Sequence, residues 1–346
     1  MTDQEEKLKK TSQESELRQD LVTGDWVVVA TGRAKRPDAF VPTERAIADE
    51  SFDPFENPEE SGQEKDVLIY RREDDDWSLR VIPNKYPVFS RGKAVRELSE
   101  GPYFAMNGVG YHEVIVTRDP HLSLGLLDTW QVAEVLDAYQ ERYLDLMNKK
   151  SVNYIQVLHN HGKEAGASLS HPHSQLMAIP VISPYVTLEL DGSERYYKTN
   201  KERVYDVMVS YEEQEKKRIV FENDHFIAFC PFASRVAFEV WIIGKRANPY
   251  FERITDEEKF ACAEALKQTL HALYKGLHDP AYNFYIHSAP CDGREYPHYQ
   301  WHIEVLPHTS TWGGLELATG IEVCQISPEA AAEFLRSKIT SEGTSS

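Results

Sequence analysis

The segment His171-Pro172-His173-Ser174-Gln175-Leu176-Met177 carries most of the structural and chemical information in this chain of 346 residues. In a β-strand, residues two apart point to the same face, so the side chains of His171, His173 and Gln175 are expected to project together. The preceding loop, Ala165-Gly166-Ala167-Ser168, can offer backbone amides and the Ser168 hydroxyl to a phosphate. Because a neutral imidazole is a competent nucleophile, His173 is a candidate for attack on phosphorus. The competing interpretation is a histidine-rich strand that binds a metal or only packs.

This segment belongs to a pattern that occurs twice. Candidate strands at residues 113–116 and 239–242 are 126 residues apart, and the helices that follow begin 128 apart, at Asp128 and Asp256. The closing His171 and His298 are 127 apart. Matched offsets of this kind indicate a duplication. We therefore predict an α+β fold of two repeats, mainly antiparallel sheet, with one long helix per repeat. The second helix is expected to bury one face, formed by Phe260, Ala263, Leu266, Leu270 and Leu273.

The domain organisation follows from this duplication. We predict a disordered lead at 1–17, an N-terminal domain with the catalytic strand at 18–184, a polar linker at 185–217, a C-terminal domain at 218–338 and a tail at 339–346.

Composition excludes several functional classes. The chain has 56 acidic and 38 basic residues, a formal charge of −18 that repels nucleic acid and anionic membrane surfaces. No apolar run approaches the roughly 20 residues of a membrane span, and the N-terminus lacks the apolar core of a signal peptide. The four cysteines are scattered, as is typical of a reducing compartment. A cytoplasmic protein is predicted.

The histidine strand resembles that of the histidine-triad superfamily, and Gln175 in the third position resembles its nucleotidyltransferase branch rather than the hydrolases. Four further segments are similar to galactose-1-phosphate uridylyltransferases, the short bacterial type above all. They are residues 21–28 (LVTGDWVV), 32–37 (GRAKRP), 84–87 (NKYP) and 298–304 (HYQWHIE), to which His159-Asn160 can be added.

The resemblance implies a ping-pong mechanism in which His173 takes a uridylyl group from UDP-glucose and passes it to galactose-1-phosphate. Gln175 would stabilise charge on the phosphoryl oxygens. Gln300 stands at the position of His173 in the second repeat, so one active site per chain is expected. The substrate-binding residues implied by the resemblance are Arg33, Arg36, Asn84, Asn160, Gly166 and Ser168.

The resemblance also implies metal sites. Family members carry Cys-Pro-Phe-Cys where this chain has Asp53-Pro54-Phe55-Glu56, and His121 and His171 match the remaining ligands of a zinc ion. Two carboxylates and two imidazoles can hold Zn²⁺ or another divalent ion. Alternatively, Asp53 and Glu56 only belong to an acidic, solvated stretch. A second set matches an iron or zinc site: Glu189, His287, His302 and Glu304.

Alternatives to the uridylyltransferase remain at this stage. The Thr319-Gly320 ending is also similar to an ADP-glucose phosphorylase branch, which transfers an adenylyl group to inorganic phosphate. A non-catalytic nucleotide- or metal-binding protein is the third hypothesis, although such a protein needs no nucleophile. The resemblance further implies a homodimer.

Overall fold

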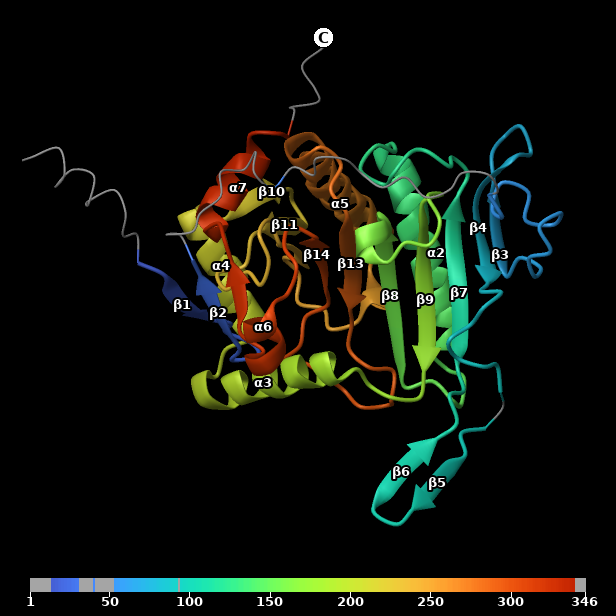
Figure 1. Ribbon diagram of the computed structural model, residues 1–346, viewed down its shortest axis with the longest axis horizontal. Helices are drawn as coiled ribbons and strands as arrows, with labels where there is room; N and C mark the ends of the chain where they lie inside the picture. Colours follow the sequence, from blue (N-terminus) through green and yellow to red (C-terminus); the bar gives the residue numbers. More distant parts are fainter. Residues whose placement is uncertain (1–13, 31–39, 41–52, 93, 340–346) are drawn as a thin grey trace, which may run out of the picture.

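Ten strands, all antiparallel, form one continuous sheet at the centre of the molecule (Figure 1). The structure, a computed structural model, describes residues 14–30, 40, 53–92 and 94–339. The strand order is β10-β11-β12-β14-β13-β8-β9-β7-β4-β3. The strands of the first repeat are β3 (Leu68–Arg71), β4 (Trp77–Pro83), β7 (Tyr111–Thr117), β8 (Tyr154–His161) and β9 (His173–Ile179). Those of the second are β10 (Ile219–Glu222), β11 (Phe226–Phe229), β12 (Val240–Gly244), β13 (Tyr282–His287) and β14 (His302–Pro307).

The strand order of the two repeats is symmetric about the middle of this sheet. Read outward from the middle, β8-β9-β7-β4-β3 on one side corresponds to β13-β14-β12-β11-β10 on the other. β8 and β13 pair directly, with Tyr282 opposite His161 and Ile286 opposite Val157. The predicted α+β class with a mainly antiparallel sheet is confirmed, and the duplication gives this sheet its symmetry.

Each repeat has one long helix, α2 (Thr129–Leu146) or α5 (Asp256–Leu277), and the two helices pack together. Both begin at a capping box, the local signal that starts a helix. At α5, the Thr255 hydroxyl accepts from the Glu258 amide at 3.2 Å, and the Glu258 carboxylate accepts from the Thr255 amide at 2.9 Å. The expected buried face of α5 needs one correction, since Phe260 is 52% exposed. Each three-residue step along a helix drifts by about 60°, so two such steps carry Phe260 away from Leu266 and the core.

The two faces of the sheet differ. Leu176 and Ala178 of β9 are buried in the main core beside Val135 and Tyr139 of α2. His173 and Gln175 have the opposite parity on the strand and therefore lie on the other face. Helices α3 (Pro184–Asn200) and α4 (Val204–Glu215) pack on the second-repeat part of that face, in a separate apolar cluster that includes Trp241 and Ile243 of β12. The cavity beside His173 lies on the first-repeat part.

Residues 185–217 differ from the expected polar linker, because they fold into α3 (Pro184–Asn200) and α4 (Val204–Glu215). The segment is rich in charge because only a narrow side of α3 is buried, including Val186, Glu189 and Leu190. Gly192 lies against the backbone of Val22, and a Cβ there would be 1.9 Å from the Val22 oxygen. Only glycine allows this approach, which fixes α3 and with it Glu189.

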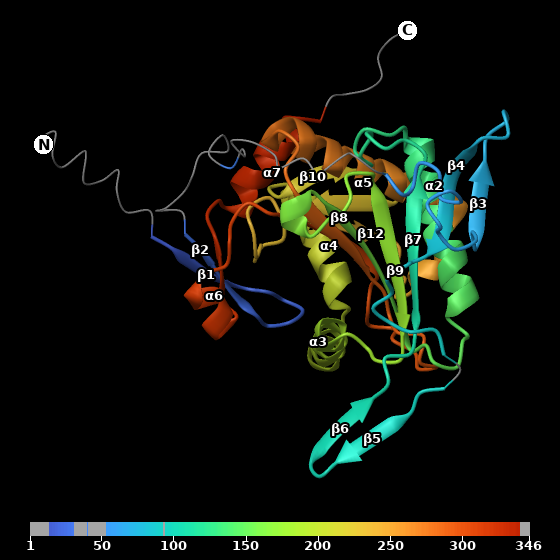
Figure 2. The ribbon, with the colours of Figure 1, turned by 45° about the vertical axis from the view of Figure 1, so that its right-hand side comes forward.

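Smaller elements surround the main sheet (Figure 2). A hairpin of β5 (Glu97–Glu100) and β6 (Tyr103–Met106) projects away from the body in both views. A three-stranded sheet joins β1 (Glu16–Gln19), β2 (Trp26–Val29) and β15 (Glu322–Cys324). The remaining helices are α6 (Gly314–Thr319), α7 (Pro328–Arg336) and the 3₁₀ turns Lys163–Ala165 and Phe251–Arg253. None of the described helices is both long and apolar enough to cross a membrane.

Candidate active site and metal cluster

His173 is the first residue of β9 and is held in one tautomer. Its Nδ1 atom is 2.8 Å from the carbonyl oxygen of His171, which can only accept, so Nδ1 carries the proton. Burial lowers the pKa of His173 below its ordinary value of 6.5, against a smaller opposing effect of that hydrogen bond. The ring is therefore neutral near pH 7 and has its lone pair on Nε2. These are the properties of an imidazole nucleophile.

Gln175 is oriented by His112 of β7, a residue that sequence analysis did not single out. The Val88 amide donates to Nδ1 of His112 at 3.2 Å, so the proton of a neutral His112 lies on Nε2. That nitrogen is 2.8 Å from Oε1 of Gln175. Burial lowers the pKa of His112, which keeps the ring neutral. With its oxygen held by His112, Gln175 has its NH₂ group left to donate to a ligand.

A cavity of about 450 Å³ opens beside His173. Four predicted site residues, Asn84, Ser168, His173 and Gln175, line it. Apolar walls come from Phe55, Val114 and Leu169, and the outer rim from Lys85 and Tyr86. Apolar walls with a few convergent polar groups are typical of a small-molecule site.

Asn160 lies on β8 and is oriented by Asn283 of β13. The Asn283 amide donates to the Asn160 oxygen at 2.8 Å and to the Ala165 oxygen at 2.9 Å. This directs the Asn160 amide nitrogen toward Gly166, where a Cβ would lie 3.8 Å away. Gly166 has a φ of +87°, so the turn that ends in Ser168 requires glycine. The contact between repeats thus fixes the side chain predicted to hold phosphate.

Strand β9 is anchored from its other face. Ser174 lies between His173 and Gln175 in sequence and points toward α2, where the Tyr139 hydroxyl donates to it. The Ser174 hydroxyl lies 3.0 Å from Nδ1 of His159, whose ring stacks on Phe284. All these side chains are buried, so they hold β9 between α2 and the second repeat.

The first predicted metal set is only partly brought together. Nδ1 of His171 lies 2.6 Å from the Asp53 carboxylate, but Glu56 and His121 are exposed to solvent. Within the described residues, these four side chains form no convergent group of metal ligands. Arg33 and Arg36 lie outside the part of the chain that the structure describes.

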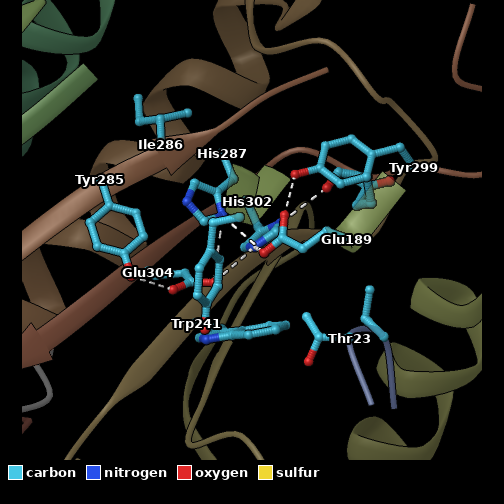
Figure 3. Close-up of polar contacts among 12 residues, drawn as sticks. Thr23, Glu189, Trp241, Tyr285, Ile286, His287, Tyr299, His302 and Glu304 are labelled. Atoms are coloured by element: carbon cyan, nitrogen blue, oxygen red, sulfur yellow. Dashed lines mark hydrogen bonds and ion pairs between the residues drawn. The ribbon is translucent and has the colours of Figure 1, made fainter. Parts of the chain in front are cut away.

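The second predicted set, Glu189, His287, His302 and Glu304, converges in the interior (Figure 3). One nitrogen or oxygen atom from each residue lies within 4.8 Å of all the others, and all four side chains are buried. Nδ1 of His287 is 3.0 Å from Oε1 of Glu189, and Nε2 of His302 is 3.3 Å from Oε1 of Glu304.

The outer atoms of these ligands are already occupied, as expected of metal ligands. The Tyr299 hydroxyl donates to Oε2 of Glu189 at 2.6 Å, and Nδ1 of His302 donates to the Gln300 oxygen at 3.0 Å. Oε2 of Glu304 accepts from Tyr285 at 2.8 Å and from Arg235.

The charge of this cluster also suits a divalent ion. Burial alone would raise the pKa of Glu304, but Arg235, His287 and His302 together hold it well below its ordinary value of 4.5. The geometry can therefore bind a metal with two carboxylates and two imidazoles. Such an ion, when bound, would join α3 to β13 and β14.

The second repeat has Gln300 where the first has His173. Gln300, at the position of His173, is buried and serves the backbone. Its oxygen accepts from the Asn248 amide at 2.9 Å, and its nitrogen donates to the Arg246 oxygen at 3.3 Å.

A duplicated histidine-triad fold with a single neutral imidazole beside a polar pocket defines the class of histidine-triad-like nucleotidyltransferases. Two protein-family models match this chain. The one for the N-terminal domain of galactose-1-phosphate uridyl transferase matches residues 4–182, and the one for a domain of unknown function, DUF4921, matches residues 108–343. The chain belongs to the galactose-1-phosphate uridyl transferase family.

Individual relatives fall in two groups. ADP-glucose phosphorylase of Arabidopsis thaliana is 34% identical over 94% of this chain and 93% of its own length. Galactose-1-phosphate uridylyltransferase of Thermotoga maritima is 28% identical over 93% of this chain and 98% of its own. The crystal structure of the Arabidopsis ADP-glucose phosphorylase with bound ADP-glucose has a TM-score of 0.80 at 32% identity, covering 96% of this chain and all of the other. A uridylyltransferase structure gives 0.73 at 28% identity, covering 94% and 98%.

Proposed function

We propose that this protein transfers a nucleoside monophosphate group from a nucleotide sugar to a phosphate acceptor through a covalent intermediate on His173. One observation carries the proposal. The Nδ1 proton of His173 is bound to the His171 oxygen, and the ring lines a polar cavity large enough for a nucleotide. A protein that only binds nucleotide or metal needs no nucleophile in that cavity.

The proposed reaction has two balanced steps. In the first, Nε2 of His173 forms a bond to the α-phosphorus, and the bond from that phosphorus to the bridging oxygen breaks, releasing the sugar phosphate. In the second, an oxygen of the acceptor phosphate forms the new bond to phosphorus, and the P–N bond breaks. The Nδ1 proton stays on the ring throughout, where the His171 carbonyl stabilises the positive charge of the nucleotidylated imidazole.

The remaining site residues act on the phosphoryl oxygens. Gln175 donates an N–H to the phosphoryl oxygens on which charge accumulates, because its own side-chain oxygen is bound to His112. Asn160, Gly166 and Ser168 hold the phosphates, and Asn84 lies on the nucleotide side. Arg33 and Arg36 supply the positive charge that an acidic chain must concentrate locally.

For the donor and acceptor, we assign ADP-glucose and inorganic phosphate, with ADP and glucose-1-phosphate as products. The support is the relationship to the plant ADP-glucose phosphorylase, at 34% identity against 28% for the Thermotoga uridylyltransferase. This assignment reverses the order of preference drawn from the sequence alone. The uridylyl alternative, with UDP-glucose and galactose-1-phosphate, retains the support of the family model over residues 4–182.

The test is the mass of the intact protein after incubation with ADP-glucose or UDP-glucose, each without acceptor. A gain of one AMP that inorganic phosphate removes supports the phosphorylase assignment. A gain of one UMP that galactose-1-phosphate removes supports the alternative. His173→Asn, with its circular dichroism spectrum unchanged, is expected to gain neither. An adduct on that variant, or none on the wild type with either donor, would reject the proposal.

The cofactor and assembly complete the proposal. We assign zinc, or alternatively iron, to the buried cluster of Glu189, His287, His302 and Glu304. The assembly is a homodimer, as the family resemblance implies. The β5–β6 hairpin exposes Leu98, Tyr103 and Phe104, apolar side chains that a second chain would cover. Light scattering on the purified protein measures the assembly directly.

A further inference from the structure

The carboxylates that stand in place of the family's two cysteines do not build a metal site. A zinc ion at this position would need ligands from Asp53, Glu56, His121 and His171. Glu56 and His121 are exposed, and the four residues do not converge. The implied metal therefore does not fit these side chains.

His171 is held between two oxygen atoms. Its Nδ1 lies 2.6 Å from Oδ2 of Asp53, and its Nε2 lies 2.7 Å from the carbonyl oxygen of Thr117. Both neighbours are oxygen atoms of the surrounding fold, so the ring is held from both sides. The ring is nearly completely buried, so neither partner is replaced by solvent.

The same residue holds the nucleophile. The backbone oxygen of His171 accepts from Nδ1 of His173 at 2.8 Å. A shift of His171 would therefore move both the position and the tautomer of His173. The Asp53–His171 contact secures the residue that carries this carbonyl.

Asp53 also secures one wall of the cavity. Its second oxygen, Oδ1, accepts from the Phe55 amide at 2.9 Å. The Phe55 ring is buried and meets the rings of His171 and His173 edge-on, at centroid distances of 5.9 and 5.3 Å. Asp53 thus connects the loop before β3, the start of β9 and the nucleophile.

We infer that Asp53 is a positioning residue for His173, and that its hydrogen bond to His171 replaces a metal ion at this place in the fold. The inference has two parts. The first, that no metal binds here, stands independently of the reaction. The second, that Asp53 supports nucleotidyl transfer, rests on the function proposed above.

Metal content tests the first part. The full-length protein, Asp53→Ala and His287→Ala are loaded with Zn²⁺, desalted and analysed by inductively coupled plasma mass spectrometry. His287→Ala, which disrupts the buried cluster, is expected to retain no zinc, and Asp53→Ala is expected to retain as much as the wild type. Stoichiometric zinc in His287→Ala that is lost in the Asp53→Ala/His287→Ala double variant would overturn the inference. Less zinc in Asp53→Ala than in the wild type would also overturn it, whereas equal zinc in these two proteins and none in His287→Ala supports it.

The rate of nucleotidylation in a single turnover tests the second part. Asp53→Ala is expected to lower that rate about 10²-fold, a typical cost of misplacing a reacting group, with little change in donor affinity. Asp53→Asn should restore much of the rate, because an amide oxygen still accepts from Nδ1–H. Glu56→Gln is expected to match the wild type, with Glu60→Gln as an exposed control. Equal losses in Asp53→Ala and Glu56→Gln would indicate a shared metal and overturn the proposal. No loss in Asp53→Ala would overturn the positioning role.

A spectroscopic measurement separates this inference from the proposed reaction. Imidazole N–H protons that are buried in hydrogen bonds exchange slowly and give resolved downfield NMR signals. A downfield N–H signal from His171, absent in His171→Gln, is expected in chelator-treated wild type and should be altered in Asp53→Ala. Unaltered signals would contradict the contact. If the wild type forms no adduct at all, the proposed function is rejected. The metal content and the NMR signals still test whether Asp53 contacts His171 in place of a metal.

Discussion

His112 and Gln175 face each other across two neighbouring strands, with Nε2 of the first 2.8 Å from Oε1 of the second. This contact decides which end of the Gln175 amide reaches the cavity. Without the His112 proton, the amide is free to present its oxygen, which would repel a phosphoryl oxygen. The orientation of Gln175, the group proposed to stabilise charge, therefore depends on a residue outside the His171–Met177 segment.

His112→Ala is expected to slow nucleotidylation about 10²-fold, because Gln175 loses its fixed orientation. His112→Gln, whose amide N–H reaches a similar position, should recover part of that loss. The measurement is the single-turnover rate, with His225→Ala, far along the chain in the second repeat, as a matched control. An unchanged rate in His112→Ala would show that Gln175 orients itself.

Acid is expected to destabilise the fold through His159. Burial holds the pKa of His159 well below its ordinary 6.5 in the folded state, with further lowering by His161 and His173. Below pH 6.5 the unfolded chain binds a proton that the folded chain does not. As the pH is lowered below 6.5, the free energy of unfolding therefore decreases, by about 1.4 kcal/mol per pH unit for one histidine. Urea unfolding between pH 7.5 and 5.5 measures the slope. His159→Gln should reduce the slope by one proton, and an identical slope would contradict this.

Loss of Glu304 is expected to cost more than loss of the metal. Glu304→Ala removes a ligand and leaves buried Arg235 with Glu239 as its remaining carboxylate partner, 2.6 Å away. Breaking a buried ion pair on one side costs about 3–5 kcal/mol. Chelation of the wild type removes the ion but keeps this pair, so its unfolding midpoint should fall less. Glu322→Ala, which changes a half-buried carboxylate near Arg235, is the control. Wild-type zinc content in Glu304→Ala would refute the ligand assignment.

Gln300→His is not expected to create a second nucleophile. Gln300 is buried, and its side chain meets the Asn248 amide and the Arg246 oxygen, so an imidazole at this position would face backbone groups rather than a ligand. After saturation with donor, the intact mass should still show one nucleotidyl group per chain. Two groups per chain, or one group on a variant that also carries His173→Asn, would disprove this interpretation.

Sequence alone predicted the parts that depend on local pattern. The matched offsets of 126 to 128 residues gave the repeats, and capping residues placed the starts of α2 and α5 correctly. The set Glu189, His287, His302 and Glu304 followed from the resemblance and converges in space. Local pattern also placed Ser168, His173 and Gln175 at one cavity.

Contacts between segments that are distant in the sequence could not be predicted from local pattern. His112 is 63 residues from Gln175, and Asn283 is 123 from Asn160, so only the register of the sheet reveals either pair. The helices of residues 185–217 were unrecognised because a charged composition masked a narrow apolar side. The residue types and spacing of Asp53 and Glu56 suggested two equivalent metal ligands. In the fold, Asp53 contacts the buried His171, whereas the Glu56 side chain is exposed to solvent.

The pairing of β8 with β13 makes the halves of this molecule inseparable. If the chain were divided between β9 and β10, each fragment would expose a long strand edge with unpaired N–H and C=O groups. Such edges recruit other strands, so either fragment alone would aggregate. Produced together, each would supply the strand that the other lacks. The second half, which has Gln300 at the position of His173, is therefore still required to complete the sheet of the first.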